Sequence, residues 1–226
     1  MANNFFNAVQ RNVSADSTLP TAVYTTPVSK KSILIELDVA NKSSSGVTVT
    51  VQVCDASQNT GTGNTRTVNA VATNTTGTLT TVSAHGLSVN DRVVFTNGTD
   101  PSFTDASLPP SGDAALSVDA GSGSRMYYVQ SVGAGDSPTT FTIAESESAS
   151  SPLTFDTTGS SLKMVKVHLA DIVRDAPVPV GGSLKVISGQ KLVIESNATN
   201  VNDKIFVYAS AATSVDCIAS VLEDVS

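Results

Sequence analysis

The stretches 31–40 (KSILIELDVA) and 47–55 (VTVTVQVCD) decide the fold class. In both, apolar and polar residues alternate with a period of two, which is typical of a β-strand with one buried face and not of a helix. The turn-rich linker 41–46 joins them, and we expect the two stretches to pair as an antiparallel hairpin. The residues expected to share one buried face of the first stretch are Ile33, Ile35, Leu37 and Val39.

The same alternation returns toward the C-terminus, in 191–195, 203–209 and 214–223. The last of these also carries Ile218 and Leu222 on its second face, so we expect that strand to be covered on both sides. Prolines cannot donate to a strand ladder, and the segment 177–182 (PVPVGG) is therefore expected at a sheet edge. The stretch 167–175 has two interpretations, a strand or one to two turns of helix.

The middle of the chain contains short strand candidates separated by long polar stretches rich in Gly, Pro, Asp and Ser. We interpret the chain as all-β. An antiparallel β-sandwich of jelly-roll or Ig-like type, residues 1–63 plus 164–226, carries a second small β domain, residues 64–163, inserted in a loop. A competing interpretation is one continuous sandwich with a long disordered excursion. The candidate strands of the middle region are 65–72, 78–83, 92–96, 125–132 and 139–144.

The composition limits the classes of function. The 226 residues carry a net charge of −7 and only 15% charged residues, against about 25% in a typical soluble domain. An acidic chain without a Lys/Arg cluster does not attract nucleic acid. With neither a signal peptide nor a long apolar run, we expect a soluble protein made in the cytoplasm, with no membrane partner.

The titratable residues show no pattern of catalysis or metal binding. Ser83, His85 and Asp91 lie in one turn without a nucleophile-elbow motif, so we expect His85 to pack or cap the turn, and the same reading applies to His168. No spacing fits a zinc or EF-hand site. We therefore predict no enzyme, no cofactor and no metal. The loosely clustered acidic residues expected in solvated loops are Asp100, Asp105, Asp113 and Asp119.

Two pairs of residues leave alternatives open. Cys54 and Cys217 both sit in apolar alternating segments and are expected as buried thiols, with a disulfide only if their strands are adjacent. Adjacent strand residues face opposite ways, so one of Tyr127 and Tyr128 is expected in the core and the other on the surface. The surface tyrosine is a weak candidate for a sugar platform.

The sandwich portion, residues 1–63 plus 164–226, resembles a family of small tailed-phage virion proteins. The resemblance is carried by 4–12 (NFFNAVQRN), 32–41 (SILIELDVAN), 176–184 (APVPVGGSL) and 214–223 (SVDCIASVLE), together with 23–25, 47–55, 190–195 and 203–205. It covers most of residues 1–63 and 164–226. It implies a structural role.

The middle portion resembles β modules of phage tails and necks. The motifs are 78–95 (TLTTVSAHGLSVNDRVVF), Leu108-Pro109, 127–129 (YYV) and 140–143 (TFTI). Asn90 stands where the pattern usually has Gly, and Asn also tolerates the left-handed backbone of a tight turn. Tyr127, Val129, Phe141 and Ile143 are expected to supply a small core.

The resemblance implies a multi-copy neck, collar or tail-associated protein in the virion of a tailed phage, acting through contacts with its own copies and other virion proteins. A capsid decoration protein is the alternative within this class, and a host-surface adhesin that binds glycan through residues 64–163 is the alternative of another class. Phe5 and Phe6 are the candidate assembly contacts, because exposed Phe pairs mark contact surfaces. Packing of both rings within the chain is the other interpretation.

Overall fold

The computed structural model describes residues 4–59, 65–71, 77–96, 125–154, 162–198 and 201–223. The regular secondary structure of the described residues is almost entirely β-strand with antiparallel pairing, as predicted; the one described helix is α1 (Ala56–Asn59). Two compact units are present, one formed by Met1–Ser57 with His168–Ser226 and the other by Gln58–Val167. We name them the two-sheet unit and the barrel unit. That the second folds as an independent inserted domain stays a prediction.

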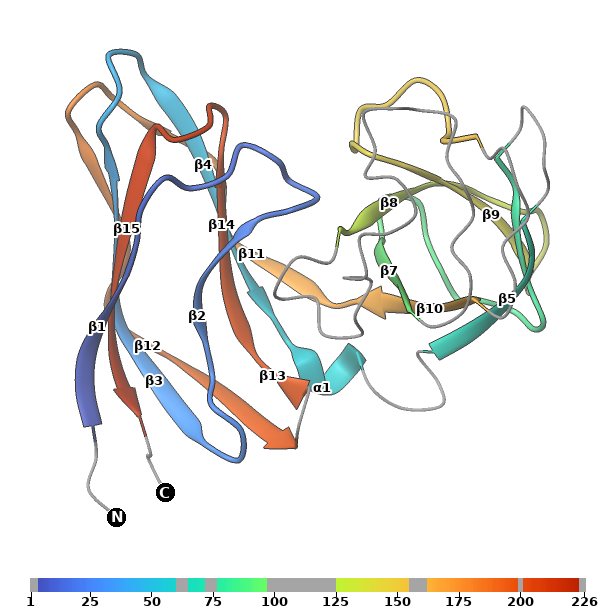
Figure 1. Cartoon of the computed structure of the whole chain (residues 1–226), viewed down its shortest axis with the longest axis horizontal. Helices are drawn as coiled ribbons and strands as arrows, with labels where there is room; N and C mark the ends of the chain where they lie inside the picture. The colour runs from blue at the N-terminus through green and yellow to red at the C-terminus, as the bar shows by residue number, and fades with distance from the viewer. Residues whose placement is uncertain are drawn as a thin grey trace. The chain divides into compact units, whose positions relative to one another are not determined.

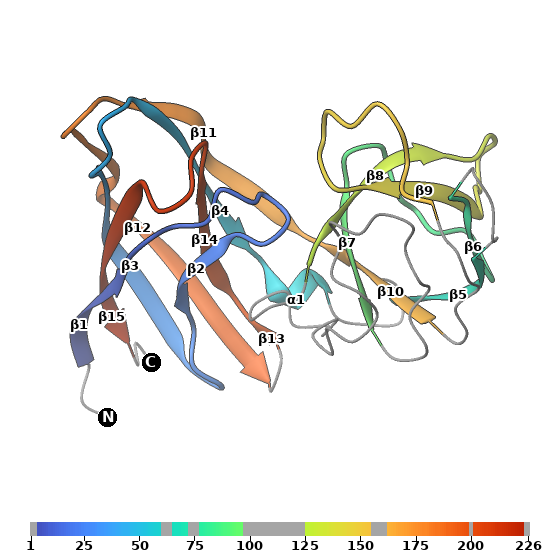
Figure 2. The same cartoon turned by 45° about the horizontal axis from the view of Figure 1, so that its top comes forward.

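The two-sheet unit contains two antiparallel sheets that share one hydrophobic core (Figure 1). Buried residues of one sheet, such as Leu34 and Cys217, belong to the same core cluster as Val51 and Val207 of the other. Sheet A has the order β1 (Asn4–Gln10), β15 (Val215–Glu223), β3 (Lys31–Asn41), β12 (Ser183–Ala198) and β13 (Val201–Asn202). Sheet B has the order β11 (Leu169–Val178), β4 (Val47–Cys54), β14 (Lys204–Ala209) and β2 (Thr21–Thr25) (Figure 2).

The predicted hairpin of 31–40 and 47–55 is wrong. β3 pairs with β12 and β15 in sheet A, whereas β4 pairs with β11 and β14 in sheet B. The linker between them crosses from one sheet to the other instead of turning back within one. Alternation fixes which side of each strand is apolar, but two apolar faces can meet across a core as well as lie side by side in a sheet.

The predicted buried face of β3 is half wrong. Leu34, Leu37 and Val39 are fully buried, whereas Ile33 and Ile35 are only partly buried. The register with β15 shifts between Leu34 and Glu36, so one extra residue, Ile35, is accommodated on β3. Such a bulge moves every residue before it to the opposite face, and period-two counting cannot detect it.

The strands after residue 167 refine three further predictions. β11, which contains Pro177, is an edge strand of sheet B as predicted, and its assignment as strand overturns the helical interpretation of 167–175. Ser188-Gly189 has the composition of a turn and predicts one from the sequence, but β12 continues through both residues. Gly189 has φ +73° within a register shift between Ser188 and Leu192, which is a bulge in a long strand.

The barrel unit is a closed six-stranded barrel, and all five strands expected in the middle of the chain are present. The strand that closes the barrel is β10 (Leu162–Val167), which pairs with both β5 (Thr65–Val71) and β7 (Arg92–Thr96). The predicted boundary at 163/164 divides this strand, whereas the compact unit extends to Val167. The strands follow the order β10 (Leu162–Val167), β5 (Thr65–Val71), β6 (Leu79–Thr81), β9 (Thr140–Ala144), β8 (Tyr127–Val132) and β7 (Arg92–Thr96).

The barrel core contains the four residues predicted for it, Tyr127, Val129, Phe141 and Ile143, all at most 2% exposed. The turn before β7 also has the predicted form. Asn90 has φ +71° and Gly86 has φ +63°, so both occupy the left-handed region that the tight turn requires. Asp91 Oδ2 accepts a hydrogen bond from the Ser88 backbone N–H at 2.7 Å.

Candidate functional site on the outer face of sheet A

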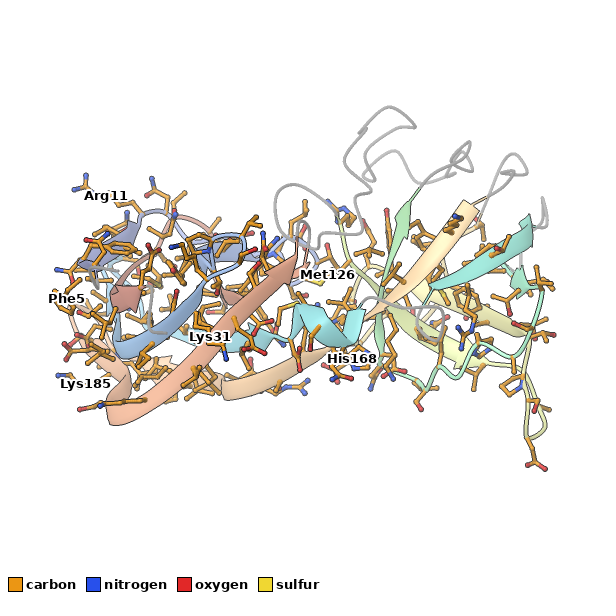
Figure 3. All side chains as sticks on the ribbon, turned by 90° about the horizontal axis from the view of Figure 1, so that it is seen from below. Phe5, Arg11, Lys31, Met126, His168 and Lys185 are labelled. Carbon is orange, nitrogen blue, oxygen red and sulfur yellow. The ribbon has the colours of Figure 1, made fainter. Side chains whose placement is uncertain are left out.

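The two candidate contact residues, Phe5 and Phe6, lie on opposite faces of β1. Phe5 points away from the core and is 59% exposed (Figure 3). Phe6 packs against the core, where its ring lies 6.1 Å from the Tyr24 ring at a tilt of 51°. The pair therefore divides between the two interpretations: Phe6 packs within the chain, and Phe5 remains on the surface.

Phe5 belongs to a row of apolar side chains that crosses four strands. In the strand register Phe5 lies opposite Leu222, Leu222 opposite Ile33, and Ile33 opposite Val193. Residues directly opposite on neighbouring antiparallel strands have side chains on the same face, within contact distance. Val193 is 60% exposed, and Leu222 and Ile33 are partly exposed. We name Phe5, Leu222, Ile33 and Val193 the outer row.

The next row along the sheet is polar. Asn7 lies opposite Ser220, whose hydroxyl donates to Asn7 Oδ1 at 3.0 Å, and Ser220 lies opposite Glu36. The Glu36 carboxylate pairs with Lys185 at 2.5 Å and raises the pKa of that amine. This polar row separates the outer row from further apolar surface on the same strands.

A second, shorter apolar patch follows the polar row. Val9 and Ile218 lie directly opposite each other and are 50% and 47% exposed. The expectation that the strand 214–223 is covered on both sides is therefore wrong within the chain itself, since Ile218 is largely open. Its inward residues Val215, Cys217, Ala219 and Val221 are fully buried, as predicted.

The inner face of β1 is anchored near its start. The Tyr24 hydroxyl donates to Glu223 Oε1 at 2.6 Å and lies 2.7 Å from the Ser32 hydroxyl. Burial, with the carboxylate of Glu223 beside it, raises the pKa of Tyr24 well above its ordinary range. The phenol is therefore a neutral donor under all ordinary conditions, and it holds the ends of β2, β3 and β15 together beneath Phe6.

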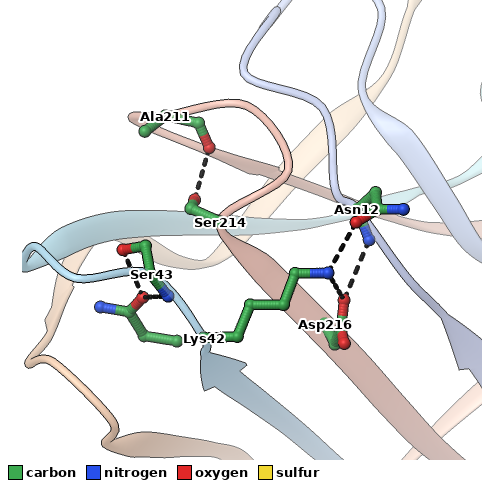
Figure 4. Close-up of polar contacts among 7 residues, drawn as sticks. Asn12, Lys42, Ser43, Ala211, Ser214 and Asp216 are labelled. Carbon is green, nitrogen blue, oxygen red and sulfur yellow. Dashed lines mark hydrogen bonds and ion pairs between the residues drawn. The ribbon is translucent and has the colours of Figure 1, made fainter.

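The far end of β1 is held by a polar cluster (Figure 4). Asp216 Oδ1 accepts from the Asn12 backbone N–H at 3.0 Å and from the Lys42 amine at 2.7 Å, and the same amine donates to Asn12 Oδ1 at 2.6 Å. Asn12 has φ +59°, a conformation that asparagine tolerates better than other non-glycine residues. With both ends fixed, β1 presents its exposed side chains in a defined register.

Replacing Asp216 by asparagine should lower the free energy of unfolding by about 1 kcal/mol at neutral pH, because the amide keeps an acceptor but loses the ion pair with Lys42. The hydrogen bonds from Lys42 and Asn12 lower the pKa of Asp216 below its ordinary 3.8 in the folded protein. The stabilisation is thus present above 3.8 and disappears as the pH falls through the folded pKa. Thermal unfolding of both proteins across that range tests this. An equal difference in acid would contradict it.

The imagined Ser83–His85–Asp91 triad is not assembled. His85 is 4% exposed, and both of its ring nitrogens bind backbone. Nδ1 accepts from the Leu87 N–H at 3.0 Å, which leaves the proton on Nε2 to donate to the Thr140 carbonyl at 3.1 Å. Asp91 pairs instead with Lys166 at 2.7 Å. His85 therefore joins the turn before β7 to β9, as expected of a packing histidine.

The expectation of one surface tyrosine is wrong, because Tyr127 and Tyr128 are 2% and 4% exposed. They do face opposite ways: Tyr127 lies in the barrel core, and Tyr128 lies under the Arg92 guanidinium, whose central carbon is 3.7 Å from the ring centroid. The Arg92 guanidinium also donates to the Tyr128 hydroxyl. A stacked cation covers the aromatic face that a sugar would need.

Cys54 and Cys217 are buried thiols that form no disulfide. They lie on β4 and β15, in different sheets, and burial raises the pKa of Cys217 to about 12. The expected loop carboxylates Asp100, Asp105, Asp113 and Asp119 lie outside the described residues. Within the described ranges, no group of three or more His, Cys, Asp or Glu side chains is arranged to hold a metal ion. None of the described helical segments has the length and apolar character needed to cross a bilayer.

Sequence reasoning identified Phe5 but missed three members of the outer row as a set. Ile33 was assigned to the buried face, and Leu222 was expected to be covered. Val193 stands between Leu192, which packs on the core, and Ile194, which is 1% exposed. Its signal was three consecutive apolar residues in a strand, which indicates an apolar residue on the outer face.

Comparison of the chain with protein-family models, with curated proteins and with solved structures gives no match.

Proposed function

We propose that this chain is a non-enzymatic structural subunit that works in many copies, through contacts with its own copies and with other proteins of a tailed-phage virion. A neck, collar or tail-associated position fits best. The finer fold assignment, a jelly-roll or Ig-like sandwich with an inserted β domain, is part of the proposal. The virion assignment rests on the sequence patterns of 4–12, 32–41 and 214–223. It also rests on the motifs 78–95 and 140–143 of the middle portion.

The outer row is the observation that supports a contact function. Soluble proteins carry single exposed apolar residues without consequence, but contiguous apolar side chains on a flat sheet face mark interaction surfaces. Phe5 and Val193, at the two ends of the row, are 59% and 60% exposed, and strand pairing makes the row continuous between them. Burying such a row against a neighbour releases roughly 25 cal/mol per Å² of apolar surface, repeated at each copy.

Substituting Val193→Lys tests the row at the end farthest from β1. We expect self-association, measured by sedimentation, to weaken by at least about tenfold, because a lysine cannot be buried against an apolar partner without a counter-charge. Val82→Lys is the matched control. Val82 lies in the barrel unit and is 62% exposed, close to the 60% of Val193.

Both valines are surface residues, so the melting temperatures of the two variants should stay near that of the unsubstituted protein. Equal self-association of the two variants would contradict the contact function. A point substitution changes the contact surface alone. Truncation of the N-terminus would also uncover β15 and the core beneath Phe6, so it would not separate a lost contact from a damaged fold.

A further inference from the structure

The free edge of β1 differs from the other three sheet edges described in the two-sheet unit. Natural proteins protect edges with short strands, prolines, bulges or charges. β13 has two residues and pairs with β12 only at its end, and the rest of β12 carries Lys185, Lys191 and two register shifts. β2 lies between Pro20 and Pro27, and β11 has Pro177, charged side chains and two register shifts. β1 has seven residues, NFFNAVQ, with no charge and no proline, and its register with β15 has no shift.

The inner face of β1 is also less buried than that of its neighbours. Val221 and Ala219, which lie opposite Phe6 and Ala8, are fully buried, and so are Leu34 and Leu37 on β3. Phe6 and Ala8 are only partly buried. Among the described residues, the backbone of β1 forms no hydrogen bond on the side away from β15. One more strand beside β1 would complete both the ladder and the core.

We propose, on the basis of the proposed contact function, that β1 pairs with β1 of a second copy, antiparallel about a two-fold axis at Asn7. The sequence NFFNAVQ is self-complementary about that residue. Antiparallel pairing there places Asn4 opposite Gln10, Phe5 opposite Val9, Phe6 opposite Ala8, and Asn7 opposite Asn7. Polar residues meet polar ones, and each phenylalanine meets a smaller apolar residue.

The register follows from the faces of the strand. A two-fold axis perpendicular to the sheet keeps the inward faces of both copies on one side, so residues of the same parity must pair. An axis at Phe6 would place Phe5 opposite Asn7, and an axis at Ala8 would place Val9 opposite Asn7. The axis at Asn7 avoids both mismatches and uses all seven residues.

The pairing also joins the two apolar patches of sheet A. Because Phe5 lies opposite Val9 of the second copy, the outer row of one copy continues into the Val9–Ile218 pair of the other. The dimer thus carries two apolar rows, each six residues long, on one ten-stranded sheet. The members of each row are Val193, Ile33, Leu222 and Phe5 of one copy, with Val9 and Ile218 of the second copy.

Cross-linking tests the axis directly. Asn7→Cys places two thiols on the same face of a directly opposed pair, a separation that a disulfide can bridge. We expect mild oxidation to convert the full-length variant to a covalent dimer. Val9→Cys alone should form no covalent dimer, because its thiol lies opposite Phe5 of the second copy, and it should cross-link only when mixed with Phe5→Cys. The native thiols do not interfere, since Cys54 and Cys217 are buried.

Introducing a charge at the axis is the second test of the pairing. Asn7→Lys and Asn7→Asp should each weaken dimerisation by at least about tenfold, because like charges meet at the axis, and an equal mixture of the two should restore it. A misfolded variant would not be rescued by mixing. Failure of Asn7→Cys to cross-link, while Val193→Lys still weakens self-association, would overturn the β1 pairing and leave the contact function standing. If Val193→Lys self-associates as strongly as its control Val82→Lys, the proposed contact function itself is overturned.

Discussion

Replacing Gly77 by alanine should unfold the barrel unit. A Cβ at this position would lie 1.7 Å from the Leu153 carbonyl oxygen and 2.8 Å from its carbon, and both atoms belong to the backbone, which cannot rotate away. Gly77 also has φ +58°, where an alanine is strained. A buried overlap combined with backbone strain places the expected loss at about 4 kcal/mol or more. Hydrogen exchange should show lost protection in β5 to β10 and retained protection in β3, β4, β14 and β15.

Gly86→Ala is the matched control for this prediction. Gly86 has φ +63°, but a Cβ there meets no atom within 4 Å. The control therefore isolates the conformational strain, which costs about 1 kcal/mol for a single left-handed residue. Equal losses in the two variants would mean that the contact with Leu153 can relax and that packing at Gly77 is unimportant.

Replacing Asn41 by alanine should destabilise the two-sheet unit by about 2–4 kcal/mol, because buried polar groups would lose their partners. Asn41 is 3% exposed and stands where the chain leaves sheet A for sheet B. Its amide nitrogen donates to the carbonyls of Ser45 at 2.8 Å and Val178 at 3.0 Å, and Oδ1 accepts from the Ser43 N–H at 2.9 Å. Chemical denaturation of the full chain measures the loss.

Asn41→Asp distinguishes hydrogen bonding from shape. The introduced carboxylate has the same size, but it would face the carbonyl oxygens of Ser45, Val178 and Pro179, so the folded protein should favour its protonated form. Folding then raises the pKa of this carboxyl. The variant should therefore regain stability as the pH falls through that raised value toward the ordinary pKa of an aspartate. Ser43→Ala, which removes one partly exposed donor, should cost less than about 1 kcal/mol. A variant Asn41→Asp as stable as the wild type at neutral pH would contradict the assigned amide orientation.

The two predictions concern positions that sequence reasoning treated differently. Asn41 was read only as the start of a turn-rich linker, because the sequence does not show whether a linker turns back or crosses a core. Gly77 was not singled out at all, since its requirement for space comes from Leu153, a residue 76 positions later in the chain.

The candidate contact surface was predictable in part. The Phe5-Phe6 pair near the N-terminus indicated a contact, and of its two members Phe5 lies on the surface. The continuity of Phe5, Leu222, Ile33 and Val193 depends on register between four strands drawn from residues 5 to 222. A single bulge at Ile35 changed the face of Ile33, and no local pattern records such a bulge.

The sequence by itself determined the all-β class, the five middle strands, the inward residues of β15, the edge position of the proline-bearing strand and the left-handed turn at Asn90. Each of these depends on side-chain alternation or on the conformational preference of one residue, and both are local properties. Only the tertiary structure decided that β3 and β4 lie in different sheets, that β10 closes a barrel, and that four apolar residues form one row. Those outcomes depend on which strands pair and in which register, and pairing is a contest between distant segments whose local patterns are alike.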